Sequence, residues 1–142
     1  MRTRRGSTFA EQLIVLVLSA ILLSITSVGG SRLLDAITVA VSTREAADLL
    51  AFARDHAVAS SRRTAVRFDA GLGRLIVHAG VDTLARANLR AASVVLRATR
   101  DSMAYAPSGL GVGAANMRLI LSRGASSDTI QISRLGRVRR GR

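Results

Sequence analysis

The stretch that decides the fold is residues 6–28, which read GSTFAEQLIVLVLSAILLSITSV. No charged residue occurs between Leu13 and Ile25. The segment from Phe9 to Val28 has about the 20 residues that an α-helix needs to cross the hydrocarbon core of a bilayer. The sequence therefore predicts one transmembrane helix within residues 7–28.

A short basic leader, residues 1–6, precedes this segment. It contains Arg2, Arg4 and Arg5 and no acidic residue. An excess of basic residues keeps its flank of a span in the cytoplasm, so we expect the bulk of the chain on the other side of the membrane. The apolar run is longer than that of an ordinary secretory signal, which indicates an anchor. Cleavage after the run, near the small residues Ser27 and Gly29, is the less favoured alternative.

Glu11 is an acid near the start of this apolar segment. Ionisable groups inside membrane spans cost roughly a few kcal/mol and usually face a partner or a functional site. The simpler alternative is a carboxylate that is solvated at the level of the lipid headgroups. We expect a specific partner for Glu11.

The order Gly6, Ser7-Thr8, Phe9-Ala10 and Glu11 resembles the class III signal of type IV pilins and pseudopilins. The resemblance implies that a prepilin peptidase cuts between Gly6 and Ser7 and that the new amine of Ser7 is methylated. It also implies that Glu11 meets the terminal amine of a neighbouring subunit, the partner that a buried carboxylate requires. Ser7 and Ala10 depart from the residue types that are usual at their positions.

The composition indicates one small domain beyond the span. The chain has 142 residues, a formal net charge of +12 and no cysteine. Without disulfides the fold depends on its core and on neighbours. The positive charge is compatible with nucleic acid, anionic lipid or an acidic partner, and it carries no information about the fold.

Residues 29–61 are predicted to continue the helix in amphipathic form. Gly29 and Gly30 weaken the helix and permit a bend. Beyond them, apolar residues recur at helical spacing, with a polar interruption at Thr43 and Arg44. These apolar residues are Leu33, Ile37, Ala40 or Val41, Ala47, Leu50, Ala53 and Ala57.

After residue 61 the pattern becomes that of strands. Residues 64–68 and 74–78 are predicted to form a hairpin around the turn at 69–73, because alternation and turn residues coincide there. Further strands are expected at 93–96, 117–121 and 129–133, with a last short one at 137–139. Residues 80–90 are ambiguous, and 107–116 are predicted to form a loop. The predicted class is α+β: a long N-terminal helix packed on a small antiparallel sheet, with a β-rich head domain at 62–142.

The distal half is similar to the GspH/FimT group of minor pilins and pseudopilins. The resemblance rests on residues 63–68, on residues 105–109, on a following hairpin and on Gly136-Arg137-Val138-Arg139. It implies a pilin fold, other pilins as filament partners, an inner-membrane assembly platform and a periplasmic head domain. Secretion, pilus and competence machineries all remain open.

No catalytic constellation, metal site or cofactor motif is predicted, and we expect a protein that is not an enzyme. His56 and His78 are the only histidines, and no cluster of metal-ligand type surrounds either one. Asp55, His56 and Ser60 do not make a triad, because adjacent helical residues face different directions.

The C-terminus is strongly basic, with five arginines among the last nine residues. One interpretation is a solvated basic tail. The alternative is that Arg137, Arg139 and Arg140 contact the phosphates of DNA, where binding is mostly electrostatic. Resemblance favours this alternative, because some FimT-type minor pilins are associated with DNA uptake through a terminal Gly-Arg-x-Arg motif. A third hypothesis is a signal-anchored envelope protein without a role in a filament.

Overall fold

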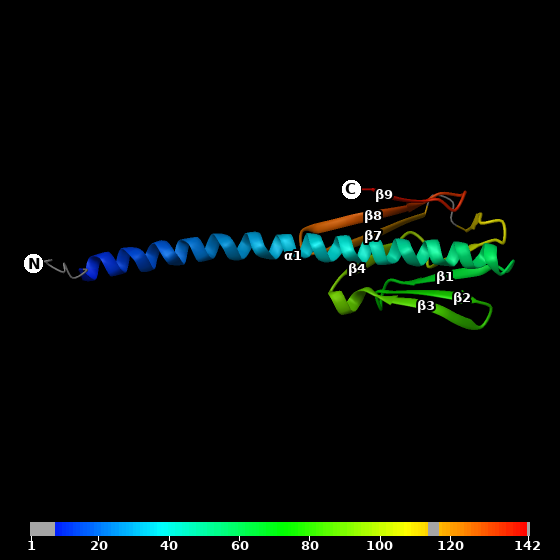
Figure 1. The fold of residues 1–142 in the computed structure, drawn as a ribbon, viewed down its shortest axis with the longest axis horizontal. Coiled ribbons are helices and arrows are strands. Elements are labelled where there is room, and N and C mark those ends of the chain that lie inside the picture. Colours follow the sequence, from blue (N-terminus) through cyan, green and yellow to red (C-terminus); the bar gives the residue numbers. More distant parts are fainter. Residues whose placement is uncertain (1–7, 114–116, 142) are drawn as a thin grey trace, which may run out of the picture. The chain divides into compact units, whose positions relative to one another are not determined.

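The computed structural model describes residues 8–113 and 117–141, and for residues 25–29 it describes the backbone alone. The chain divides into an N-terminal unit, Met1–Leu34, and a C-terminal unit, Asp35–Arg142. In chain order the elements (Figure 1) are α1 (Phe9–Ala59), β1 (Thr64–Asp69), β2 (Arg74–Ala79), β3 (Asp82–Asn88), the 3-10 turn η1 (Leu89–Ala92), β4 (Val95–Ala98), β5 (Ser102–Tyr105), β6 (Gly111–Val112), β7 (Met117–Arg123), β8 (Ser126–Ile132) and β9 (Val138–Gly141).

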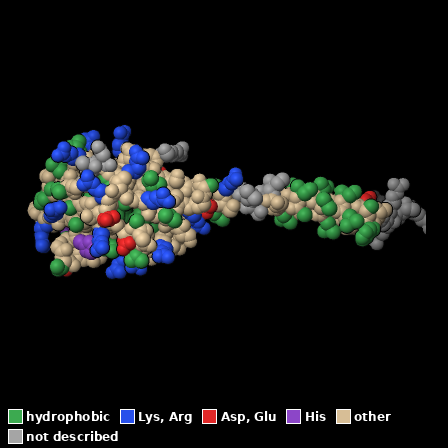
Figure 2. Space-filling model, turned by 180° about the vertical axis from the view of Figure 1, so that it is seen from behind, with side chains coloured by type: hydrophobic (Ala, Val, Ile, Leu, Met, Phe, Trp, Pro, Cys, Tyr) green, Lys and Arg blue, Asp and Glu red, His purple; other side chains and the backbone are tan. Residues whose placement is uncertain are grey.

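Helix α1 has 51 residues and contributes to both units. The backbone is helical at Gly29 and Gly30, so the predicted continuation of the helix past these glycines is confirmed. In the N-terminal unit the large apolar side chains of α1 are exposed (Figure 2). Among the residues that the structure describes, no helix meets the length and hydropathy required of a membrane span.

The buried face of α1 in the C-terminal unit differs from the predicted one. Leu50, Ala53 and Ala57 are buried as expected, whereas Ile37 is exposed. Of the two alternatives Ala40 and Val41, Ala40 is half-buried and Val41 is exposed. The observed buried face includes two residues with hydroxyl side chains, Ser42 and Thr43. Its other members are Val39, Ala46, Leu49, Leu50, Ala53 and Ala57. Thr43 is buried without penalty because its hydroxyl donates a hydrogen bond to the carbonyl of Val39 at 2.8 Å.

The strands form two antiparallel sheets where one was expected. A five-stranded sheet has the order β3-β2-β1-β5-β6, and a four-stranded sheet has the order β4-β7-β8-β9. The predicted hairpin of β1 and β2 is confirmed, with Val66 opposite Val77. The ambiguous segment at 80–90 contributes β3, which pairs with β2 and leaves its other edge open. The split follows from β4, which pairs with β7 instead of with the first hairpin.

One hydrophobic core joins α1 to both sheets. It includes Leu50 from the helix, Val66 and Leu75 from the larger sheet, and Leu119 and Ile130 from the smaller one. In Figure 1, within the C-terminal unit, β8 and β9 are drawn above the helix and β1, β2 and β3 below it. Arginine side chains are spread over the visible face of this unit (Figure 2). The fold class, α+β with a long N-terminal helix on antiparallel strands, is confirmed.

Candidate functional site

The first candidate site is the start of α1, where Thr8 and Glu11 bind each other. The backbone N–H of Thr8 donates to Oε2 of Glu11 at 2.7 Å, and the backbone N–H of Glu11 lies 3.4 Å from the hydroxyl of Thr8. This reciprocal pair is a capping box, which satisfies two backbone donors at the end of a helix. The negative charge is also favourable near the positive end of the helix dipole.

The capping box was missed from the sequence, although Thr8-x-x-Glu11 has its spacing. Glu11 therefore has a partner within its own chain. Any donor on a neighbouring subunit must share the carboxylate with Thr8 or displace it. Gly6 and Ser7, the predicted cleavage and methylation residues, lie outside the described residues, and their roles stay predictions.

The second candidate site is the basic C-terminus, which is an edge strand. Strand β9 pairs with β8, with Arg139 opposite Gln131 and Arg140 opposite Ile130. Arg140 binds Asp128, with 2.6 Å between Nε and Oδ2. Asp128 is buried and also accepts the backbone N–H of Thr129 at 2.8 Å. Arg140 thus neutralises a buried carboxylate of its own chain.

Arg137 and Arg139 are exposed and line one cavity with Arg54 of α1. The cavity has a volume of about 620 Å³, and Ser133, Leu135 and Val138 complete its lining. Arg54 is held in place because its Nε donates to the carbonyl of Gly109 at 3.1 Å. Sequence reasoning did not find Arg54, since only the tertiary fold brings this helix position beside the last strand.

Gly136 fixes the turn that carries these arginines. Its φ is +73°, and a Cβ atom there would lie 2.5 Å from the carbonyl oxygen of Gly109 and 3.1 Å from Cε1 of Tyr105. The turn is closed by a hydrogen bond of 3.0 Å from the N–H of Ser133 to the carbonyl of Arg137. The glycine of the Gly-Arg-x-Arg sequence is therefore required for packing of the turn, independently of any ligand.

Tyr105 lies beneath this turn as a fully buried side chain. Its hydroxyl has no hydrogen-bond partner among the described residues. Burial raises the pKa of Tyr105 to about 12, and the nearby positive charge of Arg54 opposes this rise. The ring supports Gly136 from below, and the hydroxyl is an unsatisfied polar group in the core.

The two histidines have local hydroxyl neighbours. Nδ1 of His56 lies 3.1 Å from the hydroxyl of Thr64, and Nδ1 of His78 lies 3.4 Å from that of Thr83. The hydroxyl of Ser60 donates to the backbone carbonyl of His56 at 2.6 Å, so it does not face the imidazole. Within residues 8–113 and 117–141 no three acidic or histidine side chains are placed to hold a metal ion.

Comparisons with known families and solved structures find proteins that are similar to this chain. Residues 42–136 match the family model described as type II transport protein GspH. The crystal structure of the type IV minor pilin FimU of Pseudomonas aeruginosa is similar with a TM-score of 0.64 and 17% identity, covering 73% of this chain and 88% of that one. The minor pseudopilin EpsH of the type 2 secretion system of Vibrio cholerae is similar with a TM-score of 0.59 and 15% identity, covering 72% and 95%.

No curated protein sequence matches the chain. The identities to FimU and EpsH are low, so these two structures show a common fold. The family model, in contrast, covers more than half of the chain and includes most of the C-terminal unit. The chain belongs to the GspH family of type II transport proteins and has the minor pilin fold.

Proposed function

We propose that the protein is a minor pilin or pseudopilin, a structural subunit of a type II secretion pseudopilus or a type IV pilus. The observation that carries the proposal is the apolar surface of α1 in the N-terminal unit. Its described large side chains are exposed, from 47% for Leu13 to 81% for Phe9. An apolar surface of this kind requires lipid or other helices to cover it.

In this proposal residues 7–28 hold the subunit in the inner membrane before assembly, with the N-terminus cytoplasmic and the C-terminal unit periplasmic. A prepilin peptidase removes residues 1–6 after Gly6 and methylates Ser7. An inner-membrane assembly platform then transfers the subunit to a filament of other pilins. The same apolar surface serves both stages, because lipid covers it first and neighbouring helices cover it afterwards.

Glu11 has two tasks in the assembled state. One carboxylate oxygen holds the start of its own helix through the backbone N–H of Thr8. An ionised carboxylate can accept several hydrogen bonds, so it has capacity for the terminal amine of a neighbour as well. The charge of that amine is created only by the cut before Ser7, which couples processing to assembly.

The test compares Glu11→Gln with Glu11→Ala. Gln retains an oxygen that can accept the Thr8 hydrogen bond but removes the charge, whereas Ala removes both. We expect normal cleavage of both variants and a loss of incorporation into sheared filaments for both, because the charge is needed for pairing. Normal incorporation of Glu11→Gln would show that Glu11 acts only as a helix cap.

A second function, DNA binding in uptake, is favoured by the cavity that brings Arg54, Arg137 and Arg139 together. Each phosphate contact contributes roughly one unit to the slope of log affinity against log salt concentration. Arg137→Ala with Arg139→Ala should therefore weaken DNA binding and reduce the slope by roughly one to two units. Arg86→Ala with Arg97→Ala, which removes two exposed arginines from β3 and β4, is the matched control. Equal effects of the two changes would leave the tail as general positive charge.

The third reading, a signal-anchored envelope protein, makes the opposite prediction about the leader. It requires residues 1–6 to remain on the chain in cells that contain the peptidase. Detection of residues 1–6 on the protein isolated from such cells would favour this reading over the other two.

A further inference from the structure

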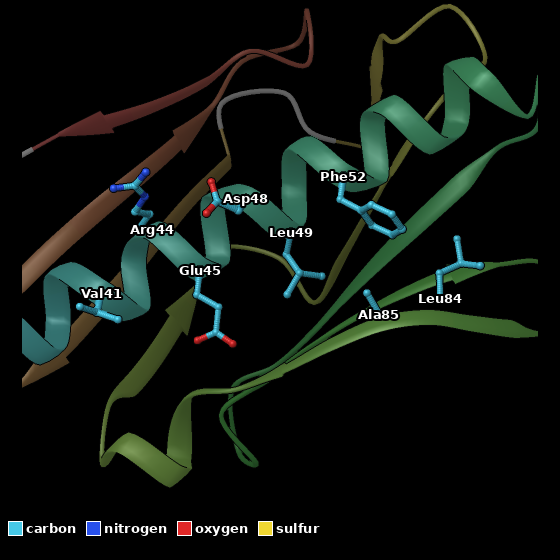
Figure 3. Close-up of a pocket in the computed structure, with 8 residues that line it drawn as sticks. All are labelled: Val41, Arg44, Glu45, Asp48, Leu49, Phe52, Leu84 and Ala85. Carbon is cyan, nitrogen blue, oxygen red and sulfur yellow. The ribbon is translucent and has the colours of Figure 1, made fainter.

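An open apolar groove of about 660 Å³ lies between α1 and the edge strand β3. Its floor is formed by Leu49 and Phe52 of the helix and by Leu84 and Ala85 of the strand. In Figure 3 the two helix side chains point toward the strand residues across this space. Phe52 is 44% exposed, although it belongs to the largest side chains of the helix. The groove is an apolar surface that the described residues of the chain leave open.

Unpaired acids border the groove. Glu45 and Asp48 are exposed and belong to its lining, together with one base, Arg44. The ion pairs found among the described residues are Asp35–Arg123 and Asp128–Arg140, so neither acid is neutralised by its own chain there. This is notable in a chain with 21 basic and 9 acidic residues. The groove suits an apolar side chain that is flanked by arginines.

The chain itself presents such a side chain at the turn between β8 and β9. Leu135 is 56% exposed there, and it stands between the exposed residues Arg134 and Arg137. The turn is fixed by the packing of Gly136 on Gly109 and by the hydrogen bond between Ser133 and Arg137. We call Leu135 on this turn, residues 133–137, the knob. Because the turn is already ordered, the knob loses little conformational entropy on binding.

Groove and knob lie on different sheets of the C-terminal unit. The groove is bordered by β3 of the larger sheet, and the knob follows β8 of the smaller one. In Figure 1 β3 is drawn below α1, and β8 and β9 are drawn above it. A contact between two different surfaces of identical subunits is heterologous, and its repetition builds an open chain unless the rotation happens to close a ring.

We propose that the groove between α1 and β3 binds the Leu135 turn of a second copy of this chain, with Arg134 and Arg137 of that copy facing Glu45 and Asp48. The proposal rests on the proposed function, because a filament orients the helices of its subunits in parallel. Leu135 lies beside Arg54 in their common cavity, whereas the groove uses helix residues 41–52. Parallel copies would then be displaced along the helix by on the order of 10 Å.

The test uses single cysteines, because the natural chain has none. Full-length chains with Ala85→Cys and with Leu135→Cys are produced in the same membranes and treated with a short bifunctional thiol reagent. We expect dimers only when the two variants are mixed. A chain that carries both changes should give a ladder of higher oligomers. Val81→Cys, at a position that is 97% exposed outside the groove, is the control partner for Leu135→Cys and should give only background.

Charge exchange tests the recognition step. Glu45→Arg with Asp48→Arg on the Ala85→Cys chain should reduce the cross-link roughly threefold or more, since exposed pairs contribute modestly. Arg134→Glu with Arg137→Glu on the Leu135→Cys chain should restore it. Dimers of the Ala85→Cys chain alone, an equal yield with Val81→Cys, or no cross-link at all would overturn the proposal.

Filament incorporation of the wild-type chain separates this proposal from the proposed function. If the wild-type chain enters filaments and the cross-link is absent, the groove proposal fails and the pilin function stands. If the wild-type chain never enters filaments, the proposed function fails, whatever the groove binds in the membrane.

Discussion

Gly136→Ala should destabilise the C-terminal unit strongly. A left-handed backbone costs an alanine roughly 1 to 2 kcal/mol, and Gly136 has a φ of +73°. The new Cβ would also lie 2.5 Å from the carbonyl oxygen of Gly109, closer than real contacts permit. Overpacking of this kind costs roughly 1 to 3 kcal/mol, so the expected total is about 3 kcal/mol. For a unit of this size the melting temperature should fall by on the order of 15 °C.

Gly113→Ala is the matched control. Gly113 has nearly the same φ, +74°, and among the described residues no atom lies within 4 Å of a Cβ built there. It therefore carries the backbone cost without the contact, and we expect a loss of only about 1 kcal/mol. The assay is thermal unfolding of the detergent-solubilised chain, followed by the fluorescence of Tyr105, which is the only tyrosine and contacts the turn. Equal losses for the two alanines would refute the packing of Gly136 on Gly109.

Two further predictions concern buried polar groups. Tyr105 has a pKa of about 12 in the folded state, whereas its pKa in the unfolded chain is near 10. The contribution of this difference to the free energy of unfolding is thus fully present below pH 10 and is lost as the pH rises through 12. Denaturant titrations between pH 9 and 12 should show this loss, on the order of 2 kcal/mol, and Tyr105→Phe should abolish it. At pH 7 Tyr105→Phe should be neutral or stabilising by up to about 1 kcal/mol, because the hydroxyl has no hydrogen-bond partner among the described residues. A Tyr105→Phe chain with a much lower free energy of unfolding at pH 7 would indicate that the hydroxyl has a hydrogen-bond partner. Arg140→Ala leaves Asp128 buried without its cation and should cost about 1 to 2 kcal/mol in urea unfolding, whereas Arg139→Ala should stay within about 0.5 kcal/mol; similar costs for both would contradict the distinct role of Arg140.

Local patterns were sufficient to predict much of the fold. The continuation of α1 follows from apolar spacing, and the hairpin of β1 and β2 follows from alternation around the turn after Asp69. Strand β3 was not predicted, because apolar and polar residues do not alternate clearly at its centre, which is Leu84, Ala85 and Arg86. The division into two sheets depends on the pairing of β4 with β7, which is a contact between segments far apart in sequence.

The first part of the predicted buried face of α1 was wrong for a physical reason. Ile37, and Val41 as the alternative to Ala40, have the spacing of core residues, but the described part of the chain does not cover them. Hydrophobic periodicity reports that a face will be buried and does not report by which molecule. In a subunit built for assembly, apolar residues at an intermolecular contact have the same pattern as those of the core.

The candidate sites also divide into those that depend on local sequence and those that depend on the tertiary fold. The capping box of Thr8 and Glu11 is local, and its spacing was available in the sequence. The neutralisation of Asp128 by Arg140 and the position of Arg54 beside the last strand require the tertiary fold. Arginines that look equivalent in a basic tail therefore have different roles, and only their neighbours distinguish them.

The proposed function requires that this chain is processed as a prepilin and assembled. Its most direct test is the intact mass of the protein in sheared filaments from cells with the prepilin peptidase, compared with that in membranes of cells lacking it. We expect a filament form that begins at Ser7 and carries one methyl group, and a membrane form that retains residues 1–6. A filament form that retains the leader, or one that begins at any residue other than Ser7, would contradict it.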